Sequence, residues 1–216
     1  GLLLLIFVFS HSNLEAIQIF KFGSNNMSFR QLAQEVSKRT SVELSNKTKD
    51  ISLKSVTSNP WLWLDETNYL LHKKNDFYVE IIPWIKKGGF LVFDNIEETN
   101  TKTQLKNKLT SKLRGSFLEE IDSESELVKS FYLFKSLPTC NGIEWSALRY
   151  DGRIAVLFIP LSLLSSLADG KAADACLRGK SKEMLYRYFI NIMMVSLTTD
   201  YKKDQIHINE ILERLN

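Results

Sequence analysis

The sequence predicts an α/β fold, a three-layer sandwich in which helices flank both faces of a mainly parallel sheet. Two observations predict it. Apolar runs of strand length alternate along the chain with segments whose apolar residues recur at helical spacing. The runs are also nearly continuous, which is typical of strands covered on both faces. With 216 residues, 44% of them hydrophobic, the chain is long enough to bury the core of one domain.

The first part of the chain supplies two predicted strands and one helix. Residues 15–23 alternate apolar and polar side chains and stop at a glycine, as a strand does. Ser28 is a suitable N-cap for a helix over residues 28–40. After two short alternating pieces within residues 42–55, residues 59–66 carry Trp-Leu-Trp-Leu and then two carboxylates, which indicates a buried strand.

The middle of the chain predicts a helix followed by a buried strand. Residues 76–89 form the helix, with Gly88 where a C-terminal cap is expected. Pro83 removes a backbone donor, so this helix either begins late, near Ile82, or bends. The apolar residues 90–93 then form the strand.

A further helix is predicted over residues 101–114, because Leu105, Leu109 and Leu113 recur every four residues. We expect its basic residues to form the solvent-exposed side of the helix and not a phosphate-binding surface. These residues are Lys102, Lys106, Lys108, Lys112 and Arg114.

The next segments predict a short strand over residues 117–121 and then a β-hairpin. Residues 147–150 and 153–159 flank the dipeptide Asp151-Gly152, which favours a type I′ turn.

Two helices close the chain. The first covers residues 181–199, and the second is a short amphipathic terminal helix over residues 205–216. The apolar stripe of the first helix is predicted to face the core and consists of Met184, Leu185, Tyr188, Phe189, Ile192 and Val195.

The N-terminal segment suggests export. Residues 1–9 lack a polar side chain, a run too short to span a bilayer, which takes about 20 residues. Its length, and the small residues Ser10 and Ser12 after it, resemble a signal peptide. We therefore expect residues 1–15 to be a signal or membrane-targeting segment, residues 16–216 to be one domain, and the protein to be exported, periplasmic or membrane-associated. The alternative is a buried first strand.

Composition argues against several classes of function. The net charge is +3, and basic and acidic residues are interspersed, so we expect no nucleic-acid partner. The histidines lie far from one another and from the cysteines, so we expect no zinc site and no cofactor. Cys140 and Cys176 fit either redox compartment, and they can form a disulfide if the protein is exported.

The order of these segments resembles the bacterial family "domain of unknown function 4159". The segments that carry the resemblance are "IQIFKFG", "NPWLWLDETNYLL", "IIPWIKKGGFLVFDN", "CNGIEWSALRYDGRIAVLF" and "NIMMVSLTT". The likeness covers roughly residues 16–200, and "GGFLVFDN" and "DGRIAVLF" are its most specific parts. Typical members have Gly-His where this chain has Asp65-Glu66, and a second Asp where it has Asn95.

The resemblance implies a flavodoxin-like or class I glutamine-amidotransferase-like fold. It also implies an accessory role in the cell envelope, without implying a reaction. The residues themselves do not indicate a reaction either. Neither cysteine lies in the Gly-x-Cys-x-Gly turn that such an amidotransferase nucleophile occupies.

Polar side chains follow the predicted buried strands. Asp65, Glu66, Asp94 and Asn95 come directly after apolar runs, and the carboxyl ends of parallel strands meet at one edge, where ligand crevices lie. Arg153 could anchor an anion there. Such carboxylates could hold a divalent ion or act as acid and base. The simpler interpretation is that Asp94 caps a segment through backbone N–H groups, with Asn95 in a turn.

Three functions remain open. The first, which we favour, is a non-catalytic envelope module that binds a protein partner, with membrane association through the N-terminal segment; it predicts an exposed apolar patch. The second is a hydrolase or transferase that uses the carboxylates at the strand ends. The third is a module that binds a small ligand or metal in the same crevice without turnover.

Overall fold

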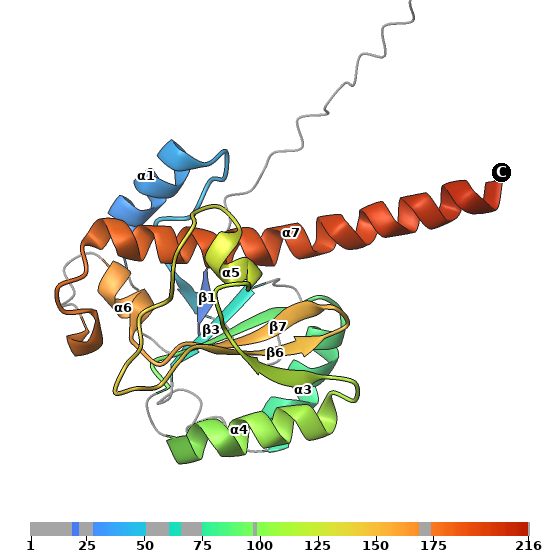
Figure 1. Cartoon of the computed structure of the whole chain (residues 1–216), viewed down its shortest axis with the longest axis horizontal. Coiled ribbons are helices and arrows are strands. Elements are labelled where there is room, and N and C mark those ends of the chain that lie inside the picture. The colour runs from blue at the N-terminus through green and yellow to red at the C-terminus, as the bar shows by residue number, and fades with distance from the viewer. Residues whose placement is uncertain are drawn as a thin grey trace, which may run out of the picture.

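The computed structural model describes residues 19–21, 28–50, 61–65, 75–96, 99–168 and 174–215. Within these residues the strands form one open mixed sheet in the order β2-β1-β3-β4-β7-β6-β5, so the predicted α/β class is confirmed (Figure 1). The strands are β1 (Phe20–Lys21), β2 (Lys49–Asp50), β3 (Trp61–Asp65), β4 (Phe90–Asp94), β5 (Phe117–Glu120), β6 (Ser146–Tyr150) and β7 (Arg153–Phe158). The helices are α1 (Arg30–Arg39), α3 (Asn75–Lys86), α4 (Thr99–Lys112), α5 (Glu126–Lys129), α6 (Leu163–Leu167), η2 (Ala175–Leu177) and α7 (Lys182–Leu215).

The sheet is mostly parallel. β1 pairs with β2 and β3, β3 with β4, and β4 with β7, all in parallel register. Only β6 runs the other way, between β7 and β5. The carboxyl ends of β3, β4 and β7 therefore lie at one edge of the sheet, together with the start of β6.

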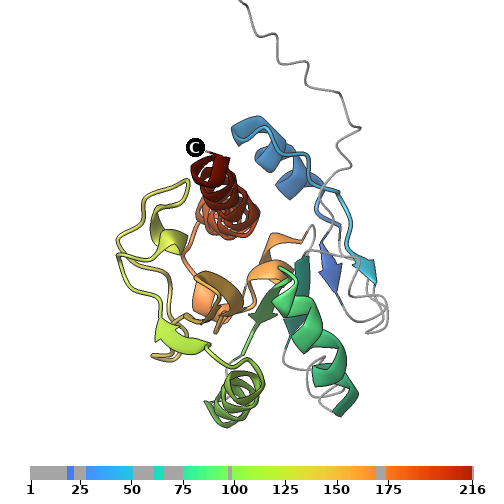
Figure 2. The same ribbon diagram turned by 90° about the vertical axis from the view of Figure 1, so that its right-hand side faces the viewer.

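Successive side chains of each central strand point to opposite faces, and both faces are covered. Trp61 and Trp63 belong to a core cluster with α1, α6 and α7, and the Trp63 ring stacks on Phe189 of α7 at 6.0 Å. Leu62 and Leu64 belong to a second cluster with α3 and α4. Figure 2 shows α1 and α7 on one side of the sheet and α3 and α4 on the other.

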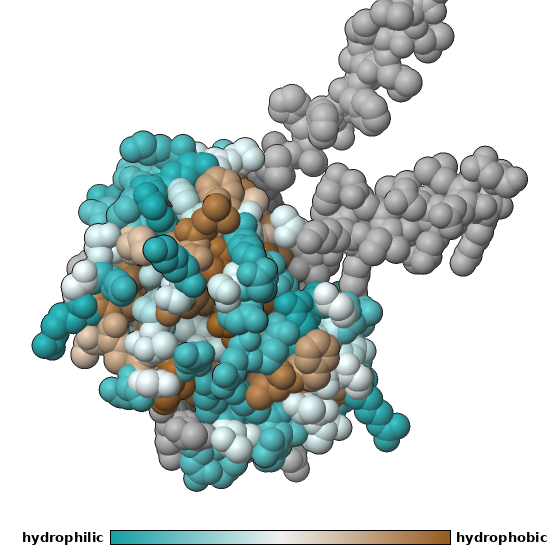
Figure 3. Space-filling view, in the orientation of Figure 1, coloured by the Kyte–Doolittle hydropathy of each residue, from teal (hydrophilic) through white to brown (hydrophobic). Residues whose placement is uncertain are grey.

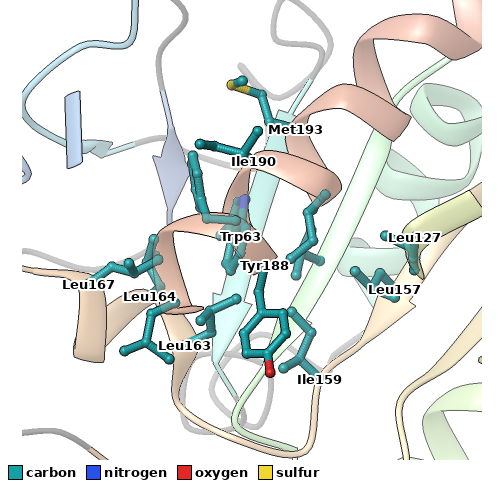
Figure 4. Close-up of a cluster of buried hydrophobic side chains, with 14 of the residues drawn as sticks. Trp63, Leu127, Leu157, Ile159, Leu163, Leu164, Leu167, Tyr188, Ile190 and Met193 are labelled. Carbon is teal, nitrogen blue, oxygen red and sulfur yellow. The ribbon is translucent and has the colours of Figure 1, made fainter. Parts of the chain in front are cut away.

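The first core cluster is centred on Trp63. Figure 4 shows this ring among side chains of α6 and α7, with Tyr188 and Ile190 from α7 and Leu163 and Leu164 from α6. All of these side chains are at most 5% exposed. The tryptophans are therefore core residues, as expected from the area that large aromatic side chains bury.

The glycine pair before β4 has two separate causes. Gly88 ends α3 with a φ of 108°, in the region that other residues rarely adopt. Gly89 is needed for space, because a Cβ atom there would lie 2.3 Å from the Trp84 ring. The strand can thus start directly beside the helix that precedes it.

Of the two alternatives expected from Pro83, a late helix start or a bend, the late start is wrong. The helix begins at Asn75 and contains Pro83 in its last turns. Both Pro83 and Val79, whose carbonyl would accept the missing hydrogen bond, lie on the solvent side. Water can therefore satisfy that carbonyl, which lowers the cost of an interior proline.

The β6–β7 turn has the predicted geometry. Asp151 and Gly152 have φ angles of 53° and 72°. Type I′ turns need positive φ at both central residues, so this prediction is confirmed.

The last helix differs from the prediction in length. α7 runs without interruption from Lys182 to Leu215, so residues 205–216 do not form a separate helix (Figure 1). Its predicted inward stripe is buried or packs against the core. Among the described helices, none combines the length and the apolar composition needed to cross a bilayer. Residues 1–15 lie outside the described part.

Asn191 of α7 holds the segment after α5 against the core through hydrogen bonds. Its amide nitrogen donates to the carbonyls of Leu127 and Tyr132 at 2.8 Å each, and its amide oxygen accepts from the Tyr132 N–H at 2.8 Å. The side chain is 1% exposed. A buried amide satisfied in this way fixes the geometry of its partners.

Candidate functional site

The carboxyl edge of the sheet is organised around Asp94. Its side chain is 4% exposed, and its two oxygens accept hydrogen bonds from the N–H groups of Leu163 (2.9 Å) and Leu164 (2.8 Å). These N–H groups belong to the first turn of α6, where they have no partner within the helix. The apolar run of β4 therefore stops on a carboxylate because the strand ends against a helix N-terminus.

The neighbouring residues connect β4 to the chain after β7. Asn95 has a φ of 60°, the turn conformation considered for it, and its N–H donates to the Leu161 carbonyl at 3.0 Å. The Ile96 N–H donates to the Ile159 carbonyl at 3.0 Å. Asp65 pairs with Asp94 in the β3–β4 register, so both strands end together. The Asp65 side chain and Glu66 lie outside the described part.

Arg153 does not share this edge, contrary to the expected crevice. It begins β7, at the opposite edge of the sheet, and is 4% exposed. Its guanidinium donates to the carbonyls of Ile85 and Gly89, the latter at 3.2 Å. Arg153 therefore binds the carboxyl end of α3, where cations are favoured by the helix dipole.

Cys140 and Cys176 form a disulfide, with their Cα atoms 5.2 Å apart. Asp174 lies next to them, and the three residues have the side chains of a metal site. However, the two sulfur atoms are bonded to each other and are not thiolate ligands. Asp174 instead accepts from the Cys176 N–H at 2.6 Å and from the Ser162 N–H at 2.7 Å. It thereby supports the start of α6 from a second side.

A group of residues that the sequence analysis missed lies at the same edge, between α4 and the sheet. Glu120, Ser146 and Phe158 are direct neighbours across β5, β6 and β7, so their side chains point to one face. This is the α4 face, because Phe158 belongs to the cluster that contains Leu105 of α4. The Lys106 ammonium lies 5.5 Å from the centre of the Phe158 ring, and the Lys102 ammonium donates to the Glu144 carbonyl at 3.0 Å.

The expectation that the α4 basic residues all face solvent is wrong for two of them. Lys102 is 9% exposed and Lys106 is half-buried. Burial lowers the pKa of Lys102. Burial, and then the charge of Lys102, lower the pKa of Lys106 to about 8, although the Glu120 charge acts in the opposite direction. Lysines perturbed in this way occur at functional sites more often than elsewhere.

The spacing of the helix could have identified these two lysines. Residues 102, 105, 106 and 109 follow the i, i+3, i+4, i+7 pattern of a single helix face. Lys102 and Lys106 thus belong to the face of Leu105 and Leu109, whereas Lys108 does not. Lys112, three residues after Leu109, lies at the border of this face and is exposed. No local signal identifies Ser146, because its surroundings are set by sheet pairing.

The comparison with known families gives one match. The model of a family described as a domain of unknown function, DUF4159, matches residues 21–197. A search of curated proteins finds no match.

Replacing Asp94 should destabilise the fold. Asp94→Ala leaves the buried Leu164 N–H without its acceptor and leaves the Leu163 N–H with the Leu161 carbonyl at 3.0 Å, so we expect a loss of about 2 kcal/mol in the free energy of unfolding. Asp94→Asn, which keeps one oxygen, should lose less. Urea denaturation measures both. Asp122→Ala is the control, because exposed Asp122 also accepts a backbone N–H, from Glu124 at 2.9 Å. An equal loss in Asp94→Ala and Asp122→Ala would contradict the capping role.

Lys106 should titrate near pH 8, against an ordinary value of 10.5. Between these values the unfolded chain keeps a proton that the folded chain has released, so this residue makes the free energy of unfolding rise with pH. Nuclear magnetic resonance of ¹³C-methylated lysines gives the midpoint. Lys102→Met removes a like charge and should raise it, and Lys106→Met should flatten the rise in stability. A Lys106 midpoint above pH 10 would refute the burial of this amine.

Proposed function

The chain belongs to the family of domains of unknown function DUF4159, and from its structure we propose a non-catalytic, exported envelope module that binds a protein partner along strand β5. The observation that carries the proposal is the exposure of apolar side chains on this edge strand. Phe117 is 55% exposed and Leu118 is 42% exposed.

β5 has the properties of a strand that accepts another strand. It is the last strand of the sheet and, in the described part of the chain, pairs with β6 alone. Phe117 and Leu118 are consecutive, so they point to opposite faces. Edge strands that only end a sheet usually carry charged or covered positions, and Glu119 and Glu120 of β5 are of this kind, but Phe117 and Leu118 are exposed apolar side chains. An extended segment of a partner would pair with the free backbone of β5 and cover both side chains.

Further apolar surface lies close by. Arg149 joins β5 to α5, because its guanidinium contacts Glu119 and Glu126 at 2.5 Å each. Directly after α5, Phe131 is 42% exposed and Leu133 is 82% exposed, in the segment that Asn191 fastens to the core. Figure 3 shows hydrophobic surface over β5 and over this segment. The partner would therefore meet a preformed surface, which lowers the entropic cost of binding.

The disulfide supports the proposed compartment. Disulfides persist in oxidising compartments and are rare in the cytosol. The pairing of Cys140 with Cys176 therefore supports export to the periplasm or to the membrane surface. The N-terminal apolar segment would supply the targeting signal or a membrane attachment.

Strand order supports the finer, flavodoxin-like assignment of the fold. The parallel strands follow the order β2-β1-β3-β4-β7, which is the flavodoxin-like order 2-1-3-4-5 with β7 counted as the fifth strand. The β5–β6 pair extends the sheet beyond this order. In this proposal it is the addition that provides the docking edge.

The alternative based on carboxylate chemistry has less support. Both oxygens of Asp94 accept hydrogen bonds from α6, so this residue acts as a helix cap. A metal site or hydrolase at this edge would have to be built on Asp65 and Glu66 without it.

Partner binding can be tested with a photo-crosslinking residue at position 118, in the organism that encodes the protein. We expect an adduct with a single envelope protein, and none from position 79, since Val79 is 65% exposed but lies on α3. The purified partner should bind Phe117→Glu about tenfold or more weakly than wild type and bind Val79→Glu normally. Equal binding to wild type and Phe117→Glu would reject β5 as the docking edge.

The compartment can be tested through the cysteines. In intact cells, neither Cys140 nor Cys176 should react with a maleimide until a reductant is added, because both sulfurs are in the disulfide. Cys140→Ser should make Cys176 reactive without reductant. Labelling of both cysteines in untreated wild type would place the chain in a reducing compartment.

A further inference from the structure

We propose that Lys102, Lys106 and Ser146 bind the phosphate group of a small ligand at the carboxyl edge of the sheet, beside the N-terminus of α4. This site is separate from the partner surface on β5 and does not depend on it. The argument uses the charge balance of the lysines, the Ser146 hydroxyl and the position of α4.

The first argument is that buried Lys102 and half-buried Lys106 lie close together, with the charge of Glu120 acting on both but no described carboxylate in contact with either. In the part of the chain that the structure describes, neither lysine takes part in an ion pair. The Lys102 ammonium has the Glu144 carbonyl as its acceptor, and the Lys106 ammonium faces the Phe158 ring. Buried charges are normally paired, and like charges in proximity repel.

The second argument is the Ser146 hydroxyl. The side chain is 1% exposed, and its oxygen has no hydrogen-bond partner within the described residues. Leaving a buried hydroxyl without a partner costs about 1–3 kcal/mol. Ser146 lies next to Phe158 in the sheet and points to the same face, so it points toward the place where Lys106 lies.

The third argument is the position of α4. This helix has 14 residues and follows β4, so its first turn, which includes Lys102, stands at the carboxyl edge of the parallel strands. Ligands of open α/β sheets lie at this edge, and helix N-termini favour phosphate. The Ser146 hydroxyl and the two lysines lie on the side of α4 that faces the sheet, so the ligand would bind on that side of the helix N-terminus.

The donors indicate the ligand class. Two ammonium groups and one hydroxyl can donate to three oxygens of one phosphate, and lysine binds phosphate as a point charge. The exposed carboxylates of Glu120 and Glu144 flank the site and would repel a long polyanion. A small phosphorylated molecule therefore fits better than a nucleic acid.

Binding requires one local movement. The Ser146 hydroxyl is buried in this conformation, so an anion can reach it only after a neighbouring side chain moves; in the proposal this is Lys106, which lies over the adjacent Phe158 ring. The amine has a lowered pKa because burial and Lys102 disfavour its charge. The negative charge of a bound phosphate would stabilise the charged form of Lys106 and so offset the effect of burial and of Lys102.

The test is the thermal unfolding of the full chain with inorganic phosphate, against chloride at equal ionic strength. Phosphate should raise the midpoint of wild type, since selective binding to the folded state stabilises it. Ser146→Ala should weaken phosphate binding about tenfold, and Lys106→Met should weaken it more. Lys108→Met is the matched control, because Lys108 is exposed on the same helix and should leave phosphate binding unchanged.

A second readout separates binding at the site from general effects of salt. Phosphate should shift the resonance of the methylated Lys106 amine with the same concentration dependence as the thermal midpoint. The proposal is overturned if wild type ignores phosphate, or if Lys106→Met and Lys108→Met respond like wild type.

Discussion

The buried carboxylate of Asp94 is the interaction on which one whole edge of the sheet depends. It satisfies two N–H groups of α6, while the next two residues bond to the carbonyls of Leu161 and Ile159. A carboxylate this deep in a protein is stable only where backbone donors replace the water that it has lost. The end of β4, the chain after β7 and the start of α6 therefore hold one another in place.

The elements of the fold were largely readable from the sequence, because their signals are local. Continuous apolar runs predicted β3, β4 and β7, and the Asp151-Gly152 dipeptide predicted the hairpin. The two wrong predictions, the start of α3 and the end of α7, depend on the surroundings of each helix, which local sequence patterns do not contain. Pro83 is tolerated because that side of α3 faces water. The polar stretch between the two predicted C-terminal helices does not interrupt α7, since a continuous helix needs no cap in its interior.

The candidate site was less readable, because it is made by pairing between distant segments. The carboxyl-end rule singled out Asp94 but not its partners in α6, about 70 residues further along the chain. Arg153 sits at the start of a strand, so strand direction alone could have excluded it from that edge. The burial of Lys102 and Lys106 was missed because lysines were assumed to lie on the solvent-exposed face of the helix. Ser146 depends on the register of three strands, which a single sequence does not contain.

The link between Cys140 and Cys176 also decides what happens when the backbone is cut. The covalent loop that it closes, with a sequence separation of 36 residues, contains β6, β7 and α6. A protease that cleaves one peptide bond inside this loop produces two pieces that stay joined through sulfur. Because β7 pairs with β4 on one side, over Val156 to Phe158, and with β6 on the other, the nicked strand would remain in the middle of the sheet. The chain can therefore lose a peptide bond in this region without losing a strand.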